Sequence, residues 1–171
     1  TWSSCIPIAI LKNINLDKVN MSYVIDISKK ALEVSYININ THKLNNIIIQ
    51  LEWSLLTPVI DKINKVDTIV ITANLPYIKD SDYDNMDNQT VEYEPDSALY
   101  WGPVTWFELY EELIQQCLYL KGFWNIKTIN LFIEIWFDQE IYSQNYLNNL
   151  WLKYNLFKDN WWIVRCIWVN I

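Results

Sequence analysis

The chain has 171 residues and a mass of 20.5 kDa, enough for one domain with a hydrophobic core. Hydrophobic residues make up 51% and charged residues 19% of the chain, which excludes a disordered or low-complexity protein. The net charge of -7 disfavours a nucleic-acid binder held by phosphate contacts, because such a binder needs a basic face. No apolar run reaches the roughly 18 to 20 residues of a membrane span, and no signal peptide opens the chain.

Cysteine and histidine usage gives no indication of a metal site. The three cysteines, Cys5, Cys117 and Cys166, lie far apart and form no CxxC pair, so we expect buried free thiols in a reducing compartment. His42 is the only histidine, and no His/Cys spacing suggests zinc. The acidic run at 80–84 lacks the glycine and the glutamate that an EF-hand loop requires. We therefore expect no bound metal.

Apolar runs alternate with helical patterns along the chain. Strands are predicted at 21–26, 46–51, 67–73, 128–135 and 163–169. Helices are predicted after an opening turn within 1–11, from the N-cap candidate Ser28 onward, at 106–120 and at 138–152. The polar, acidic segment 74–100 is predicted to be a long loop, of the kind that is usually functional. This alternation predicts an α/β fold with a mostly parallel sheet.

Three sequence features follow predicted strands or open the chain at positions suited to ligand binding. In open parallel sheets, ligands bind beyond the carboxyl ends of the strands. The opening turn, Asp26 and the segment 74–77 all fall there. Asp26, the acid at the end of the predicted strand 21–26, can accept hydrogen bonds from ribose hydroxyls of a nucleotide-like cofactor, although it can equally cap the next helix.

The residues Asn74-Leu75-Pro76-Tyr77 resemble the [DNS]-P-P-[YF] signature of methyltransferases that modify amide or exocyclic amine nitrogens. An ordinary Asn-Pro turn is the alternative interpretation of these four residues alone. The segments that follow resemble the peptide chain release factor glutamine methyltransferases, the PrmC/HemK family, in the family's order. They are 91–99 (V-x-x-E-P-x-x-A-L), 101–110 (G-G-x-x-x-G-L-x-x-Y), 131–139 (L-x-x-E-I-G-x-x-Q) and 158–165 (K-D-x-x-G-x-x-R).

The resemblance implies a fold and an activity for the whole chain. The implied fold is a Rossmann-like S-adenosylmethionine-dependent methyltransferase, with a mostly parallel twisted sheet, helices on both faces and no first strand. Residues 1–171 would form the catalytic domain, N-terminally truncated and without the family's helical N-terminal domain. The implied reaction transfers a methyl group from S-adenosyl-L-methionine to the glutamine amide of the GGQ motif in class I release factors. A bacterial cytoplasmic monomer with no membrane or direct nucleic-acid contact is expected.

The resemblance also assigns the catalytic and substrate-binding residues. The Asn74 side-chain oxygen and the Leu75 carbonyl would accept hydrogen bonds from both N–H groups of the target amide. Pro76 would stiffen the loop, and Tyr77 would offer an aromatic face. The family usually has proline where this chain has Leu75. Two further residues would shape the substrate loop, Glu94 and Pro95.

The cofactor-binding residues come from four segments. Thr1-Trp2-Ser3-Ser4 resembles the T-G-S-G part of the family's cofactor loop. Asp26 would bind the ribose hydroxyls, Ser54 and Leu55 would lie near the adenine, and Asn74 would border the cofactor. Many relatives have aspartate where this chain has Ser54.

Tryptophan stands at many glycine positions of the family. The chain has 10 tryptophans but only 2 glycines, whereas about a dozen glycines are usual for this length. The matched positions are 2, 53, 101, 106, 136 and 162. We interpret this as a gene that uses UGA for glycine and was translated with the tryptophan code. An indole at Trp2 would occupy cofactor space, so the chain as printed is expected to be impaired.

Two other functions are compatible with parts of the sequence. N-L-P-Y also occurs in ribosomal RNA adenine dimethyltransferases, so a nucleic-acid adenine N6-methyltransferase is the alternative enzyme. An aromatic-rich binding module, with tryptophans stacking on sugars or bases, is the alternative without catalysis.

Overall fold

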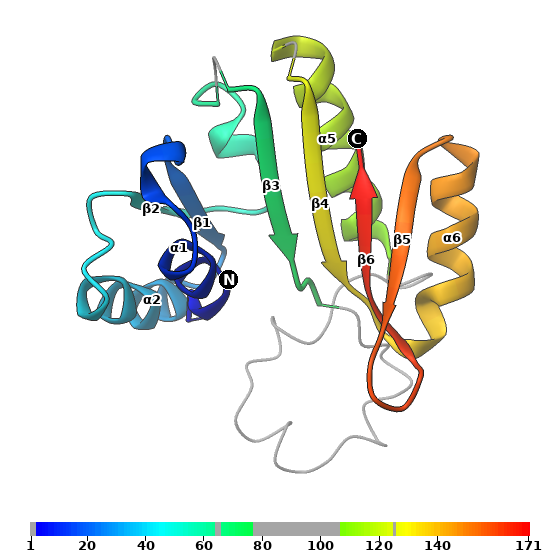
Figure 1. Cartoon of the computed structure of the whole chain (residues 1–171), viewed down its shortest axis with the longest axis horizontal. Coiled ribbons are helices and arrows are strands. Elements are labelled where there is room, and N and C mark those ends of the chain that lie inside the picture. Colours follow the sequence, from blue (N-terminus) through cyan, green and yellow to red (C-terminus); the bar gives the residue numbers. More distant parts are fainter. Residues whose placement is uncertain (1–2, 64–65, 77–106, 125) are drawn as a thin grey trace. The chain divides into compact units, whose positions relative to one another are not determined.

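A computed structural model describes residues 3–63, 66–76, 107–124 and 126–171 (Figure 1). The chain divides into two compact units, Thr1–Asn64 and Lys65–Ile171. Each unit combines helices with a sheet, so the predicted α/β class is confirmed. That both units belong to one catalytic domain stays a prediction.

The first unit is built on two parallel strands joined by a helix. Its elements are α1 (Cys5–Lys12), the 3-10 turn η1 (Leu16–Lys18), β1 (Ser22–Asp26), α2 (Lys29–Thr41), β2 (Ile48–Glu52) and η2 (Thr57–Val59). β1 pairs with β2 from Ser22 opposite Ile48 to Asp26 opposite Glu52. The carboxyl ends of both strands therefore lie at the same edge, and Asp26 lies at this edge, as the sequence predicted.

Local sequence explains where α2 begins and which face it buries. Ser28 caps the helix as predicted, because its hydroxyl accepts the Ala31 N–H at 3.3 Å. The helix packs on both strands of the unit. The core residues of this unit are Ile8, Leu11, Val24, Ile39, Leu44 and Ile48.

The second unit is a four-stranded mixed sheet. Its elements are β3 (Thr68–Ala73), α5 (Glu108–Trp124), β4 (Thr128–Glu134), η4 (Phe137–Gln139), α6 (Glu140–Asn149), β5 (Lys153–Lys158) and β6 (Val164–Asn170). The strand order is β3-β4-β6-β5. β3 and β4 are parallel, whereas β6 runs antiparallel to both β4 and β5.

Strand β4 alternates between a buried and a more accessible face. Ile129, Leu131 and Ile133 are fully buried, while the residues between them are half-buried. The helix α5 packs on β4 and α6 packs on β5 (Figure 1). Burial of these alternate residues under helices is the pattern expected for a sheet with one face in the core.

One strand was missed by the sequence analysis. β5 follows α6 directly, and the prediction of a helix over 138–152 is wrong at its end because α6 stops at Asn149. Burial does alternate at the start of β5: Tyr154 and Leu156 are half-buried, and Lys153, Asn155 and Phe157 are exposed. The helix ends where Trp151 adopts a left-handed backbone with φ 55°.

Candidate functional site

Asp26 connects three parts of the first unit through its backbone and its side chain. Its Oδ1 accepts the Ser28 N–H at 2.8 Å, which ties the carboxylate to the start of α2. Its carbonyl accepts the Trp53 N–H at 3.0 Å, which holds the segment after β2 against the end of β1. A carboxylate has about four acceptor positions, so it can hold a helix start and also accept further donors. Both interpretations of this acid are therefore compatible with its geometry.

The structure brings the predicted adenine-binding residues to the same strand ends as Asp26. Ser54 is exposed and Leu55 is half-buried, directly after β2. Leu55 has φ 53°, a left-handed backbone that favours glycine over a branched side chain. Trp53 is 56% exposed, so its indole covers little of the core. This turn is held to the backbone of Asp26 by the Trp53 N–H.

The turn before α1 is held by a buried polar network. Ser4 is fully buried with φ 63°, and its hydroxyl lies 2.5 Å from the Ser35 hydroxyl. Gln50 donates to Ser35 Oγ at 2.8 Å, and Asn38 donates to the Ser3 carbonyl at 2.9 Å. The sequence analysis missed these α2 and β2 partners, although polar residues on a helix face that packs on strands are a usable signal. Thr1 and Trp2 lie outside the described residues.

The end of β3 carries the residues predicted to do the chemistry. Asn74 is exposed, and Leu75 and Pro76 are half-buried. The Leu75 N–H donates to the Tyr110 hydroxyl at 2.9 Å, and that hydroxyl donates to the Glu134 carbonyl. The backbone of this segment is thus tied to α5 and to the end of β4. Three other predicted residues lie outside the described part of the chain: Tyr77, Glu94 and Pro95.

A second set of contacts holds the turn after β4. The Trp136 N–H donates to Gln139 Oε1 at 2.9 Å, and the Gln139 backbone N–H donates to the Trp136 carbonyl at 3.0 Å. The Arg165 guanidinium lies 5.1 Å from the centre of the Trp136 ring. These residues come from the two motifs at 131–139 and 158–165, so the structure joins motifs that are separate in sequence.

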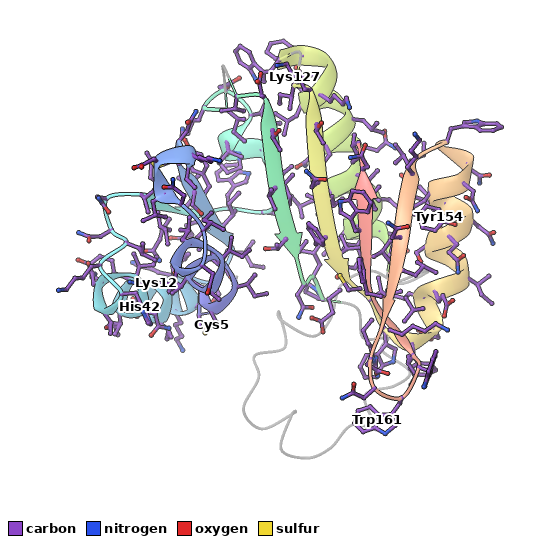
Figure 2. The ribbon with its side chains drawn as sticks, in the orientation of Figure 1. Cys5, Lys12, His42, Lys127, Tyr154 and Trp161 are labelled. Carbon is purple, nitrogen blue, oxygen red and sulfur yellow. The ribbon has the colours of Figure 1, made fainter. Side chains whose placement is uncertain are left out.

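The hairpin between β5 and β6 is organised by one carboxylate. Asp159 accepts hydrogen bonds from the N–H groups of Trp161 and Ile163 and from Arg165 Nε. Desolvation acts to raise the pKa of Asp159, but these donors outweigh it and hold the pKa below its ordinary value. Trp161 lies on this hairpin and is 81% exposed (Figure 2).

Within the described residues, no three His, Cys, Asp or Glu side chains gather in a way that could hold a metal ion. Among the helices of the same residues, none has both the length and the apolar character needed to cross a membrane.

The fold is that of a known class of protein. The chain has the fold of Rossmann-like S-adenosylmethionine-dependent methyltransferases. It superposes on the catalytic domain of human METTL16 in complex with a MAT2A 3′UTR hairpin, with a TM-score of 0.67, 12% identity and coverage of 99% of this chain and 61% of that one. It also resembles SMU.1697c of Streptococcus mutans in complex with SAH, with a TM-score of 0.60, 12% identity and coverage of 99% and 84%.

A curated relative gives a closer sequence match. The release factor glutamine methyltransferase of Rhodopirellula baltica is 34% identical over 104 residues, which are 60% of this chain. The chain spans about a third of the length of that relative, since the match covers 33% of it. No family model matches the chain.

Proposed function

We propose that this chain is the catalytic part of a methyltransferase that uses S-adenosyl-L-methionine to methylate the glutamine side-chain amide of class I release factors. The observation that carries the proposal is the Asn-Leu-Pro segment at the end of β3, with an exposed Asn74 and a backbone anchored at Leu75. The 34% identity to the Rhodopirellula baltica enzyme supports the substrate class.

The mechanism needs orientation more than a strong base. An amide nitrogen is a poor nucleophile because its lone pair is delocalised into the carbonyl. The Asn74 side-chain oxygen and the Leu75 carbonyl would accept hydrogen bonds from the two amide N–H groups and fix the nitrogen for attack. The methylated nitrogen would then release one of its two protons to water. Pro76 fixes its own φ and so limits the motion of the Leu75 carbonyl. The cofactor, when bound, supplies an electrophilic methyl group on sulfur.

The residues of the first unit would hold the cofactor. Asp26 would accept the ribose hydroxyls, while Ser54 and Leu55 would contact the adenine. The buried pair of Ser4 and Ser35 would keep the turn before α1 in its left-handed conformation, where backbone can approach a ligand closely. We place this activity in the bacterial cytoplasm, with the enzyme as a monomer and a release factor as its protein partner.

The test is methyl transfer from labelled S-adenosyl-L-methionine to a recombinant class I release factor. The enzyme is expressed with every residue its gene encodes and with glycine at positions 2, 53, 101, 106, 136 and 162. We expect label on the GGQ glutamine and none on a release factor whose GGQ glutamine is replaced by alanine. Transfer to an adenine-bearing RNA hairpin instead would favour the nucleic-acid alternative and overturn the proposal.

A variant pair tests the role of Asn74. Asn74→Ala should reduce methyl transfer by about 100-fold or more, because it removes an orienting contact at the reacting nitrogen. Cofactor affinity should change little. Asn145→Ala, an exposed residue of α6, is the matched control and should keep full turnover.

A further inference from the structure

The Tyr110 hydroxyl bridges two strand ends that no longer pair with each other. β3 and β4 are parallel neighbours, and their last paired residues are Ala73 and Ile133. Beyond them, the Leu75 N–H donates to the Tyr110 hydroxyl at 2.9 Å, and this hydroxyl donates to the Glu134 carbonyl. A tyrosine hydroxyl can accept and donate at once. It therefore links the two backbones where their direct pairing has ended.

The ring of Tyr110 is held firmly enough for its hydroxyl to act as an anchor. Tyr110 is fully buried in α5, and its ring centre lies 5.2 Å from that of Phe107. Phe107 in turn packs edge-on against Tyr142 and Tyr146 of α6, with centre distances of 5.7 and 6.1 Å. Tilted and edge-on aromatic pairs at these distances are favourable. The hydroxyl therefore sits at a fixed point relative to both helices.

The backbone at Leu75 needs such an anchor. Pro76 has no N–H, so within the predicted substrate-binding segment 74–77 the Leu75 N–H is the last backbone donor before Tyr77. The Leu75 N–H belongs to the peptide that carries the Asn74 carbonyl, and fixing this peptide restricts both neighbouring residues. A shift of about 1 Å at a reacting centre can cost about 100-fold in rate.

We propose that Tyr110 is a positioning residue that sets Asn74 and the Leu75 carbonyl for methyl transfer by holding the Leu75 N–H against the end of β4. This inference rests on the proposed function of the same turn. Tyr110 touches neither the reacting atoms nor the cofactor in this account, and it acts only through the backbone of Leu75.

The experiment compares Tyr110→Phe with Tyr154→Phe in the complete enzyme used above. The first variant removes only the bridging hydroxyl. The second removes a hydroxyl that bonds Asn148 at 3.2 Å on the far side of the unit (Figure 2). We expect Tyr110→Phe to lower kcat at least about tenfold, with the dissociation constant for S-adenosylhomocysteine and the KM for release factor within about twofold of wild type. Tyr154→Phe should keep kcat.

Amide hydrogen exchange separates the possible results. In Tyr110→Phe, the Leu75 amide should exchange faster while the β4 core amides keep their protection. If the wild-type enzyme transfers methyl and Tyr110→Phe keeps its kcat, the positioning role is refuted. If Tyr110→Phe loses protection throughout β4 and also loses cofactor affinity, then Tyr110 has a merely structural role, and the positioning role is refuted as well. A wild-type enzyme that is inactive on release factor contradicts the proposed function, whereas an unchanged Leu75 exchange rate contradicts only this inference.

A second, independent observation concerns the backbone of two tryptophans. Trp151 and Trp162 have φ 55° and 65°, in the left-handed region that favours glycine. They are 93% and 80% exposed, so neither indole gains burial in return for the strained backbone. A non-glycine residue in this region costs roughly 1–2 kcal/mol, and the exposed indoles add apolar surface.

Both positions lie in motifs with a specific place for glycine. After α6, the Trp151 N–H bonds the Asn148 carbonyl at 3.0 Å and the Leu152 N–H bonds the Leu147 carbonyl at 3.1 Å. This is a Schellman motif with Trp151 at the C′ position, where glycine is preferred. In the β5–β6 hairpin, the Trp162 N–H bonds the Asp159 carbonyl at 3.1 Å. Trp162 is the last residue of the three-residue loop 160–162, and its left-handed φ is the one that a bulge glycine usually adopts there.

We infer that the cell reads positions 151 and 162 as glycine. Position 151 lies outside every motif that carried the family resemblance, so its backbone supports the recoding interpretation independently. Trp168 provides the contrast, because its indole N–H donates to Asn130 Oδ1 at 3.0 Å and its side chain is half-buried. We assign tryptophan at that position.

The test is mass spectrometry of the protein purified from its own cells. We expect glycine at 151 and 162 and tryptophan at 168. Tryptophan at both 151 and 162 would overturn the inference. In recombinant protein, Trp151→Gly should lower the unfolding equilibrium constant about fivefold, since about 1 kcal/mol of strain is relieved, whereas Trp168→Gly should raise it. A Trp151→Gly variant that is less stable than the parent would contradict the strain argument.

Discussion

Ser4 and Ser35, 31 positions apart in the chain, share a hydrogen bond between two buried hydroxyl groups. Gln50 donates to the same Ser35 oxygen, so a residue from the turn before α1, one from α2 and one from β2 meet at a single point. A fully satisfied buried network fixes one arrangement of its elements, because every alternative leaves a polar group without a partner. The left-handed Ser4 backbone is maintained by this network.

Ser35→Ala tests that network. The change removes the shared hydroxyl and leaves the Ser4 hydroxyl buried without this partner, so we expect the free energy of unfolding to fall by about 1–3 kcal/mol. Urea unfolding followed by circular dichroism measures it. Glu33→Ala, an exposed position on the same helix, should change the free energy by less than about 0.5 kcal/mol. Equal effects of the two substitutions would show that the network contributes no stability.

Asp26 is expected to contribute to cofactor affinity through its charge. Asp26→Ala should weaken S-adenosyl-L-methionine binding by about 1–3 kcal/mol, the usual range for a lost hydrogen bond to a charged group. Asp26→Asn keeps an oxygen that can accept the Ser28 N–H, and so it separates the helix start from the cofactor contact. Isothermal titration calorimetry measures both variants. Unchanged affinity in Asp26→Ala would mean that this carboxylate only holds the Ser28 N–H at the start of α2.

Two of the thiols should differ sharply in reactivity. Cys5 is exposed, so the expectation of a buried thiol is wrong at this position, whereas Cys117 is fully buried in α5. Burial raises the pKa of Cys117 to about 12 from the ordinary value of 9.0. In native protein, an aromatic disulfide reagent should therefore modify Cys5 quickly and Cys117 only after unfolding. Mass spectrometry of the modified peptides locates the label; rapid native modification of Cys117 would contradict the packing of α5 on β4.

The same burial makes stability depend on alkaline pH. The Cys117 pKa is higher in the folded state than in the unfolded state, so its stabilising contribution is complete below about pH 9 and is lost as the pH rises toward about 12. Cys117→Ala removes this titration. The difference in unfolding free energy between wild type and Cys117→Ala should shrink over that window, and a constant difference would show that the thiol does not titrate as described.

The sequence was sufficient to predict the elements that carry local signals. Ser28 marked the start of α2, and apolar runs marked β1 to β4 and β6. It was not sufficient for contacts that depend on the tertiary arrangement. Nothing local marks Tyr110 as the partner of Leu75, because the two residues are 35 positions apart and their contact requires the start of α5 to lie beside the end of β3. The strand β5 was missed because Phe157 is apolar but exposed, which breaks the alternation that Tyr154 and Leu156 begin in the sequence.

Asp159 should make the β5–β6 hairpin sensitive to acid. Its pKa is lowered in the folded state, so its stabilising contribution is present above the ordinary value of 3.8 and is lost as the pH falls through the folded value. Asp159→Asn keeps one acceptor for the N–H groups of Trp161 and Ile163 but loses the pairing with Arg165, which lies at 3.2 Å. At neutral pH the variant should therefore be less stable than wild type, and the gap should stay nearly constant while the pH is above the ordinary value of 3.8 and close as the pH falls through the lower folded value. Urea unfolding at several pH values measures the gap, and Asp138→Asn, an exposed residue of η4, is the control. A gap that is the same at every pH would show that the carboxylate acts as a neutral acceptor and that its charge contributes nothing to the hairpin.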